Sequence, residues 1–198
     1  MKLLSALKFE RRQVTPEAAA ERIRLVALDV DGVLTDGRIG YGCGSEHEIK
    51  FFDVKDGSGV TMLRRAGVQV GIISGRKSVT NARRAQELKM DFLVEQCWNK
   101  LEGLEQVAAE RTLSLEECLY IGDDLIDGET LAGAGVGVAV ADAMPEVLSA
   151  ADFQTEAPGG RGAVREVANW LLRLQGKWPA AVRHYQKRGD AVWRPDLE

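Results

Sequence analysis

Residues 24–36 read RLVALDVDGVLTD, an apolar run that ends in two aspartates and a glycine. A short run rich in Leu and Val, closed by turn residues, is typical of a buried strand, and we predict one over 24–29. Residues two apart in an extended chain face the same way, so Asp29 and Asp31 are expected to project into one site. Gly32 frees the backbone to turn sharply after the strand.

The same alternation of short apolar runs and longer amphipathic stretches continues along the chain. Further strands are predicted over 68–73, 92–94, 118–121, 136–140 and 152–154. Helical periodicity is present over 58–65, 79–88, 100–111, 125–132, 145–150 and 162–174. Strands that alternate with helices form βαβ units around a parallel sheet, so the sequence predicts a doubly wound α/β fold.

The stretch 38–54 breaks this alternation, because it has no helical period and contains Gly40, Gly42 and Gly44. We predict a β-hairpin inserted after the first strand, with Gly44 and Ser45 in its turn.

The length of 198 residues suits one compact domain with short extensions. The predicted division is an N-terminal extension over 1–20, a core over 21–176 that includes the hairpin, and a C-terminal tail over 177–198. The tail has no evident core pattern.

Composition excludes several classes of protein. Hydrophobic residues make up 45% and charged residues 28%, as in ordinary globular proteins. The net charge of -4 argues against general attraction to nucleic acid or to an anionic membrane. The apolar run within residues 1–12 is too short for a signal peptide or a membrane span, so a cytoplasmic protein is expected. Cys43, Cys97 and Cys118 have no paired spacing, which predicts reduced thiols.

Two polar segments follow predicted strands, at the edge where ligands bind in open parallel sheets. Ser74, Gly75 and Arg76 precede a helix, and a hydroxyl with free backbone N–H groups at a helix N-terminus can seat an anionic phosphoryl group. Lys100 begins a later helix, where an ammonium would offset phosphate and carboxylate charge. Ser is also a common helix cap and most lysines are solvated, so these residues count only together with nearby acids.

The acids come from a third segment, residues 122–127, which reads GDDLID. Three carboxylates within one turn of chain repel one another unless a cation joins them, and a hard dication with oxygen ligands does so. We therefore predict a Mg²⁺ site that combines this segment with Asp29. Asp123 is the first choice as ligand, and Asp124 and Asp127 are expected to hold waters, the lysine or the loop itself.

A phosphate ester bound at such a site could react with both acids of the first strand. Asp29 would attack phosphorus, and a protonated Asp31 would hand a proton to the departing alkoxide. Two other interpretations stay open for the first motif alone: a simple turn after a strand, or the start of a calcium loop. A full EF-hand pattern is absent, because no glutamate stands at the end of a suitable loop.

The Asp-x-Asp-Gly run at 29–32, Ser74, Lys100 and GDDLID at 122–127, in this order, resemble the haloacid dehalogenase superfamily of phosphatases. Four stretches make the resemblance narrower: DVDGVLTDG at 29–37, SGRK at 74–77, GDDLID at 122–127 and GGRGAVRE at 159–166. Within that superfamily they are most similar to the 3-deoxy-D-manno-octulosonate 8-phosphate phosphatases. The resemblance runs from about 24 to about 177, most of the chain.

The resemblance implies a Rossmann-like core without a cap domain, with the hairpin at 38–54 as a small flap. It also implies a homotetramer whose subunits close one another's active sites. The roles it implies are Asp29 as nucleophile and metal ligand, Asp31 as acid/base and as a metal ligand through its carbonyl, Ser74 and Lys100 as phosphate contacts, and Asp123 as the other carboxylate ligand.

The substrate of that family is an eight-carbon acid sugar phosphate of lipopolysaccharide precursor synthesis, so a cation must meet the sugar carboxylate. Lys55, Arg76 and Arg84 are expected near the mouth of the site, with Asp31 and Gly75 also touching substrate. A solvent-facing position for Arg84 stays open. Asp56, which follows the flap, is expected to cap the next helix.

Two other functions compete with this one. Related phosphatases act on nine-carbon nonulosonate 9-phosphates through the same motifs. Similar domains also occur as non-catalytic oligomerisation modules fused to sugar-nucleotide synthases. The presence of Asp29, Asp31, Lys100 and Asp123 argues against a module without activity, because such a module need not keep every charged residue.

Overall fold

The computed structural model describes residues 15–42 and 48–186. Six parallel strands form one sheet in the order β5-β4-β1-β6-β7-β8. They are β1 (Leu25–Leu28), β4 (Gln69–Ile73), β5 (Phe92–Val94), β6 (Cys118–Gly122), β7 (Val136–Ala139) and β8 (Phe153–Gln154). The predicted α/β fold with a doubly wound parallel sheet is confirmed, and each predicted strand is present.

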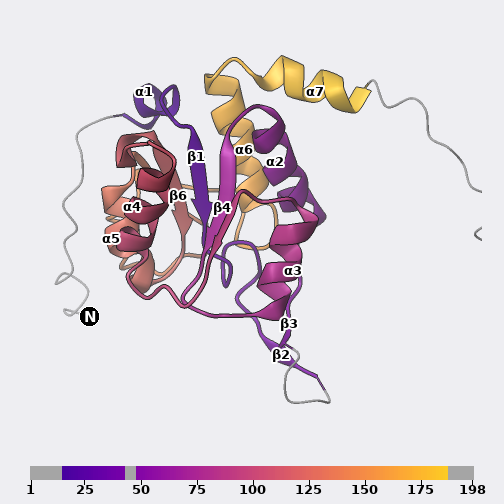
Figure 1. Ribbon diagram of the computed structural model, residues 1–198, viewed down its shortest axis with the longest axis vertical. Helices are drawn as coiled ribbons and strands as arrows, with labels where there is room; N and C mark the ends of the chain where they lie inside the picture. The colour runs from indigo at the N-terminus through magenta and orange to yellow at the C-terminus, as the bar shows by residue number, and fades with distance from the viewer. Residues whose placement is uncertain (1–14, 43–47, 187–198) are drawn as a thin grey trace, which may run out of the picture.

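Helices cover both faces of this sheet. They are α1 (Pro16–Ala20), α2 (Val54–Arg65), α3 (Val79–Glu87), α4 (Lys100–Glu110), α5 (Gly128–Gly133), α6 (Ala163–Leu174) and α7 (Trp178–Gln186), with short 3-10 turns η1 (Leu115–Glu117) and η2 (Leu125–Asp127). Figure 1 shows α2, α3 and α6 on one face and α4 and α5 on the other. The chain leaves β1 toward β4 and β5 and then returns to β6 on the other side, so the strand order reverses between β1 and β6. Ligands bind at such a reversal.

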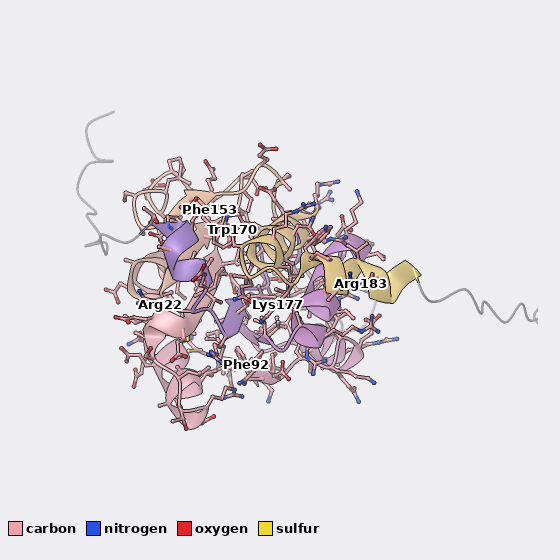
Figure 2. All side chains as sticks on the ribbon, turned by 90° about the horizontal axis from the view of Figure 1, so that it is seen from above. Arg22, Phe92, Phe153, Trp170, Lys177 and Arg183 are labelled. Carbon is pink, nitrogen blue, oxygen red and sulfur yellow. The ribbon has the colours of Figure 1, made fainter. Side chains whose placement is uncertain are left out.

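The core consists of the central strands and the helix faces that cover them. All residues of β1, β6 and β7 are buried, which explains why these strands read as continuous apolar runs and not as alternating ones. Helix α6 packs along α2 and also closes the β8 edge, where the Trp170 ring lies 4.7 Å from that of Phe153 (Figure 2).

Helix α2 begins earlier than predicted, at Val54, because the Asp53 side chain caps it. The prediction that Asp56 caps the helix after the flap is therefore wrong. Asp56 lies within α2, is buried, and accepts hydrogen bonds from Gly162 N (3.1 Å) and Arg165 N (2.9 Å). Its carboxylate satisfies the free N–H groups at the start of α6 and so ties α6 to α2.

The stretch 145–150 is a series of turns and not the predicted helix. Val147 N–H donates to the Met144 carbonyl and Ala150 N–H to that of Val147, each three residues back, whereas an α-helix bonds four residues back. Met144 N–H donates to the Asp123 carbonyl at 2.8 Å. That bond fixes the start of the stretch to an acidic loop.

The predicted hairpin is present as β2 (Gly40–Tyr41) and β3 (Glu48–Ile49), which pair antiparallel. Its predicted turn at Gly44 and Ser45 lies outside the described residues. The hairpin and α7 lie at opposite ends of the sheet, with the hairpin beyond the carboxyl end of β1 (Figure 1). Helices α1 and α7 were not predicted. Among the described residues, every helix is too short or too polar to cross a lipid bilayer.

Candidate active site

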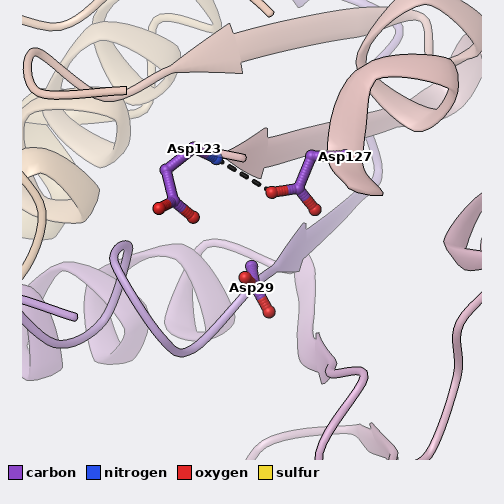
Figure 3. A group of neighbouring side chains, drawn as sticks. All are labelled: Asp29, Asp123 and Asp127. Atoms are coloured by element: carbon purple, nitrogen blue, oxygen red, sulfur yellow. Dashed lines mark hydrogen bonds between the residues drawn. The ribbon is translucent and has the colours of Figure 1, made fainter. Parts of the chain in front are cut away.

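Three aspartates converge beyond the carboxyl ends of the two central strands. Carboxylate oxygens of Asp29, Asp123 and Asp127 lie within 4.8 Å of one another (Figure 3). The pairing of β1 with β6 brings them together, because Leu28 is in register with Ile121 and Asp29 N–H donates to the Ile121 carbonyl at 3.0 Å. Acids far apart in the sequence thus meet at the reversal of strand order.

The Asp127 carboxylate is saturated with hydrogen-bond donors. Its Oδ1 accepts from Lys100 Nζ (2.7 Å) and from the Tyr120 hydroxyl (2.6 Å), and its Oδ2 accepts from the backbone N–H of Asp123 (2.9 Å) and of Asp124 (3.1 Å). A carboxylate offers about four lone-pair directions, and all are used here. Asp127 therefore organises the loop and leaves metal binding to its neighbours.

Asp29 and Asp123 are the carboxylates with room for a cation. Burial, reinforced by the Asp127 charge and opposed by Lys100, raises the pKa of Asp29 to about 7. Burial and the charges of Asp29 and Asp127 raise the pKa of Asp123 to about 8. Asp123 Oδ1 is buried and has no hydrogen-bond partner among the described residues. Closely spaced, under-bonded oxygens are the donor set that Mg²⁺ prefers, so these residues fit the predicted ion.

Lys100 lies between two of the acids. Its ammonium is 3.0 Å from Asp29 Oδ1 and 2.7 Å from Asp127 Oδ1, and its side chain is almost fully buried. Burial disfavours the charged form of Lys100, but the two carboxylates outweigh it and the pKa is raised. The lysine is therefore a fixed positive charge beside Asp29, as the sequence predicted from its place at the start of α4.

The Asp31 carboxylate turns away from the acidic group. Lys50 Nζ lies 2.7 Å from its Oδ1 and Arg76 Nε lies 3.9 Å from its Oδ2. The prediction that Asp29 and Asp31 face one site stays a prediction, because the two carboxylates have different partners: Asp29 lies with Asp123 and Asp127, and Asp31 lies with Lys50 and Arg76. That difference gives them different chemistry.

Ser74 and Gly75 form the turn between β4 and the segment before α3. The buried Ser74 hydroxyl accepts from Arg76 N–H at 3.2 Å, and Ser74 N–H donates to the Val94 carbonyl at 2.8 Å. A side chain at Gly75 would contact Ile126 and Trp98 at ordinary distances. The turn faces the loop after β6, as a seat for an anion would require.

The other predicted substrate contacts differ in exposure. Lys55 is exposed on the first turn of α2, and Arg76 is half exposed and paired with Glu48. Arg84 is mostly covered: its guanidinium lies 5.2 Å from the centroid of the Phe52 ring and donates to the Asp53 carbonyl at 3.2 Å. These are the contacts of a residue that fastens the end of the flap to α3.

The glycine-rich stretch 159–166 packs against the loop after β1. A Cβ at Gly159 would lie 1.7 Å from the Gly32 carbonyl oxygen, and Gly160 N–H donates to the Val33 carbonyl at 2.8 Å. Gly32 itself has φ +99°, and a Cβ there would lie 2.0 Å from Asp123 Oδ2. Two loops and an acidic side chain can approach this closely only where glycines stand.

Sequence reasoning missed three residues of the site. Tyr120 is fully buried in β6 and donates to Asp127, and its signal was a hydroxyl within an otherwise apolar strand. Lys50 and Glu48 belong to the flap, where charged residues are usually solvated and no motif marks them.

Comparison with known proteins agrees with this geometry. The family of haloacid dehalogenase-like hydrolases matches residues 92–165. The parallel sheet and the acids at its central strand ends are thus those of a haloacid dehalogenase-like hydrolase. The phosphatase KdsC of Escherichia coli K12, which acts on 3-deoxy-D-manno-octulosonate 8-phosphate, is 44% identical over 160 residues, 81% of this chain and 85% of that protein. The chain belongs to the 3-deoxy-D-manno-octulosonate 8-phosphate phosphatase family.

Solved structures of the family superpose closely. The enzyme of Moraxella catarrhalis, in complex with magnesium ion, phosphate ion and KDO, gives a TM-score of 0.83 at 36% identity, covering 86% of this chain and 97% of that one. The enzyme of Yersinia pestis gives a TM-score of 0.80 at 40% identity, and the match covers 82% of this chain and 88% of that one. The likeness therefore extends over nearly the whole of each solved chain.

Proposed function

We propose that this chain hydrolyses 3-deoxy-D-manno-octulosonate 8-phosphate with Mg²⁺, through an aspartyl-phosphate on Asp29. The observation that carries the proposal is the convergence of Asp29 and Asp123, from adjacent strand ends, to within 4.8 Å. The 44% identity to a phosphatase of that substrate supports the choice of sugar.

In the first half-reaction, an oxygen of the Asp29 carboxylate forms a bond to phosphorus while the ester P–O bond breaks. The departing sugar oxygen takes a proton from the carboxylic acid of Asp31, which becomes a carboxylate. Lys100 holds a positive charge 3.0 Å from Asp29 and offsets the negative charge that gathers around it.

In the second half-reaction, water gives a proton to the Asp31 carboxylate and attacks the phosphorus of the aspartyl-phosphate. The bond between phosphorus and the Asp29 oxygen breaks, which releases inorganic phosphate and restores both acids. Mg²⁺, held by Asp29, Asp123 and the Asp31 carbonyl, supplies electrostatic stabilisation of the phosphoryl oxygens when it is bound.

The remaining site residues bind the ends of the substrate. The Ser74 hydroxyl and backbone N–H groups of the turn after β4 contact the phosphoryl group, although α3 itself begins only at Val79. Arg76, which is half exposed beside Asp31, and the exposed Lys55 are the cations for the sugar carboxylate. We assign Arg84 to holding the flap, because its guanidinium is already engaged by Phe52 and Asp53.

Phosphate release from purified full-length protein with Mg²⁺ tests the function. The eight-carbon sugar-acid 8-phosphate, a nonulosonate 9-phosphate and unrelated sugar phosphates would be compared by kcat/KM. We expect the first to be preferred. Preference for the nine-carbon substrate would replace the proposed substrate, and no phosphate release from any of them would favour a non-catalytic oligomerisation module.

We propose a homotetramer in the cytoplasm, with residues 21–176 as the catalytic core and the segments before and after it as extensions. Exposed Trp98 and Leu125 beside Lys100 give an apolar surface suited to a second subunit. Size-exclusion chromatography with light scattering measures the mass of the assembly. A monomer at the protein concentration used in the activity assay would contradict the homotetramer.

A further inference from the structure

A lysine of the flap is buried against the proposed proton donor. The Lys50 side chain has no exposed surface, and its ammonium lies 2.7 Å from Asp31 Oδ1. The contact is a close ion pair and not an aligned hydrogen bond. A buried ammonium is costly unless it is paired, so its partners determine where it sits.

Two further groups hold Lys50 in place. Its ammonium donates to Asn81 Oδ1 at 3.0 Å, and Glu48 Oε2 lies 3.7 Å away. Asn81 is fully buried in α3, so this partner is fixed by the packing of the helix. The ammonium thus has one hydrogen bond, to Asn81, and two ion-pair partners, Asp31 and Glu48.

The flap strand that carries Lys50 is fastened to the same helix. The Thr80 hydroxyl donates to the Glu48 carbonyl at 2.9 Å, and Arg76 forms an ion pair with the Glu48 carboxylate. The base of the flap is thus joined to α3 through side chains and backbone. The Lys50 side chain has no exposed surface in this position, so it contacts Asp31 and not a substrate.

We propose that Lys50 is a positioning residue, which holds the Asp31 carboxyl group where it exchanges a proton with the leaving oxygen. The inference rests on the proposed function. It assigns the flap a role in catalysis within its own subunit: Lys50, which directly follows β3, brings an ammonium to the loop after β1, and Asn81 of α3 fixes that ammonium.

The proton step determines what the loss of Lys50 changes. When the P–O ester bond breaks, an alkoxide must take the proton of the Asp31 carboxylic acid, because it is a strongly basic leaving group. 4-Nitrophenolate and acetate are weakly basic and depart without that proton. A displaced Asp31 therefore lowers kcat/KM, which reports the first half-reaction, for sugar phosphates and leaves it nearly unchanged for aryl and acyl phosphates. The second half-reaction also uses Asp31, but it is common to all three substrates and enters kcat only. General damage to the site lowers kcat/KM for all of them.

The experiment compares the full-length protein with Mg²⁺ on the eight-carbon sugar phosphate, 4-nitrophenyl phosphate and acetyl phosphate. For Lys50→Met we expect kcat/KM on the sugar phosphate to fall by about 10-fold to 100-fold, with less than about a threefold change in kcat/KM on the other two. Lys50→Arg should restore part of the loss. Lys89→Met, at an exposed lysine just after α3, is the matched control and should behave as wild type.

Circular dichroism and thermal unfolding show whether Lys50→Met folds. If it does not, Asn81→Ala provides the test, because it removes the hydrogen-bond partner of Lys50. It touches neither Asp31 nor substrate, and the same leaving-group pattern is expected at smaller size. Equal losses of kcat/KM on all three substrates, or no loss of kcat/KM on the sugar phosphate, would overturn the proposal. A wild-type protein that cleaves only the aryl and acyl phosphates would instead contradict the proposed function.

Discussion

The Lys100 ammonium lies 2.7 Å from Asp127 Oδ1, and both side chains are almost completely shielded from solvent. A buried ion pair stabilises a fold only when its remaining donors and acceptors are also satisfied. Here Tyr120 and two backbone N–H groups complete the shell of Asp127, and Asp29 accepts a second contact from Lys100. The pair therefore builds the loop that carries Asp123 and fixes a positive charge beside the proposed nucleophile.

Replacement of Asp127 by Asn should destabilise the protein by about 3 kcal/mol, because an amide cannot accept from all four donors and leaves the Lys100 charge poorly paired. Urea unfolding followed by circular dichroism measures this. Asp124→Asn is the matched control, since Asp124 is exposed and its side-chain oxygen caps Leu125 N–H, which an amide oxygen also does. Equal stability of the two variants would show that the shell around Asp127 is not the stabilising feature.

Asp29→Asn should reduce turnover by at least about a thousandfold, since the attacking oxygen is lost. Its fold should persist, because burial already favours the neutral form of this side chain, whose pKa is raised to about 7. Phosphate release and thermal unfolding measure the two effects. Substantial remaining turnover in a folded variant would transfer the nucleophilic role to another residue.

The acids of this site could be predicted because they follow strand ends. Asp29 and Asp123 stand directly after apolar runs, and in a parallel sheet those positions share one edge. A role for Lys100 in the site could be predicted only from its occurrence together with these acids, because most lysines are solvated. The exact partners of Asp127 could not be predicted, because they depend on how Tyr120 and the loop fold back within one turn.

Contacts between distant segments explain the remaining misses. Asp56 reads as a local cap, yet its bonds go to Gly162 and Arg165, which only the packing of α6 on α2 brings near. Lys50 reads as a solvated charge in a hairpin, yet α3 buries it. Local sequence gives the periodicity of an element but not the neighbour that it meets in the fold.

Metal binding should depend on pH in a direction set by two raised pKa values. The pKa is about 7 for Asp29 and about 8 for Asp123, whereas such groups titrate near about 4 in an unfolded chain. Between about pH 4 and about pH 8, the folded metal-free protein thus holds protons that the unfolded chain has lost. Its free energy of unfolding therefore falls as the pH rises through that range. Mg²⁺ displaces these protons, so the rise in Tm on adding Mg²⁺ should grow from about pH 5.5 to about pH 8.5.

Differential scanning fluorimetry with and without Mg²⁺ at each pH tests this. Asp123→Asn is the control, because it removes one titrating group and one ligand, and its Tm shift should be small at every pH. Chelation should abolish turnover, and Mg²⁺ should restore it. A Tm shift that is constant with pH would mean that the ion binds away from these acids.

Gly32→Ala should disable the site through a clash and not only through backbone strain. Its Cβ would lie 2.0 Å from Asp123 Oδ2, so the acid must move, and we expect weaker Mg²⁺ binding and a loss of turnover of at least about tenfold. Gly67→Ala separates the two causes, since Gly67 also has a positive φ of +82° but, among the residues that the structure describes, no atom within 4 Å of the added Cβ. Both variants should lose about 1 kcal/mol of stability from the left-handed conformation, and only Gly32→Ala should need more Mg²⁺ for half-maximal turnover. If the Mg²⁺ requirement were unchanged in Gly32→Ala, Asp123 would not be the ligand that the close approach of this glycine serves.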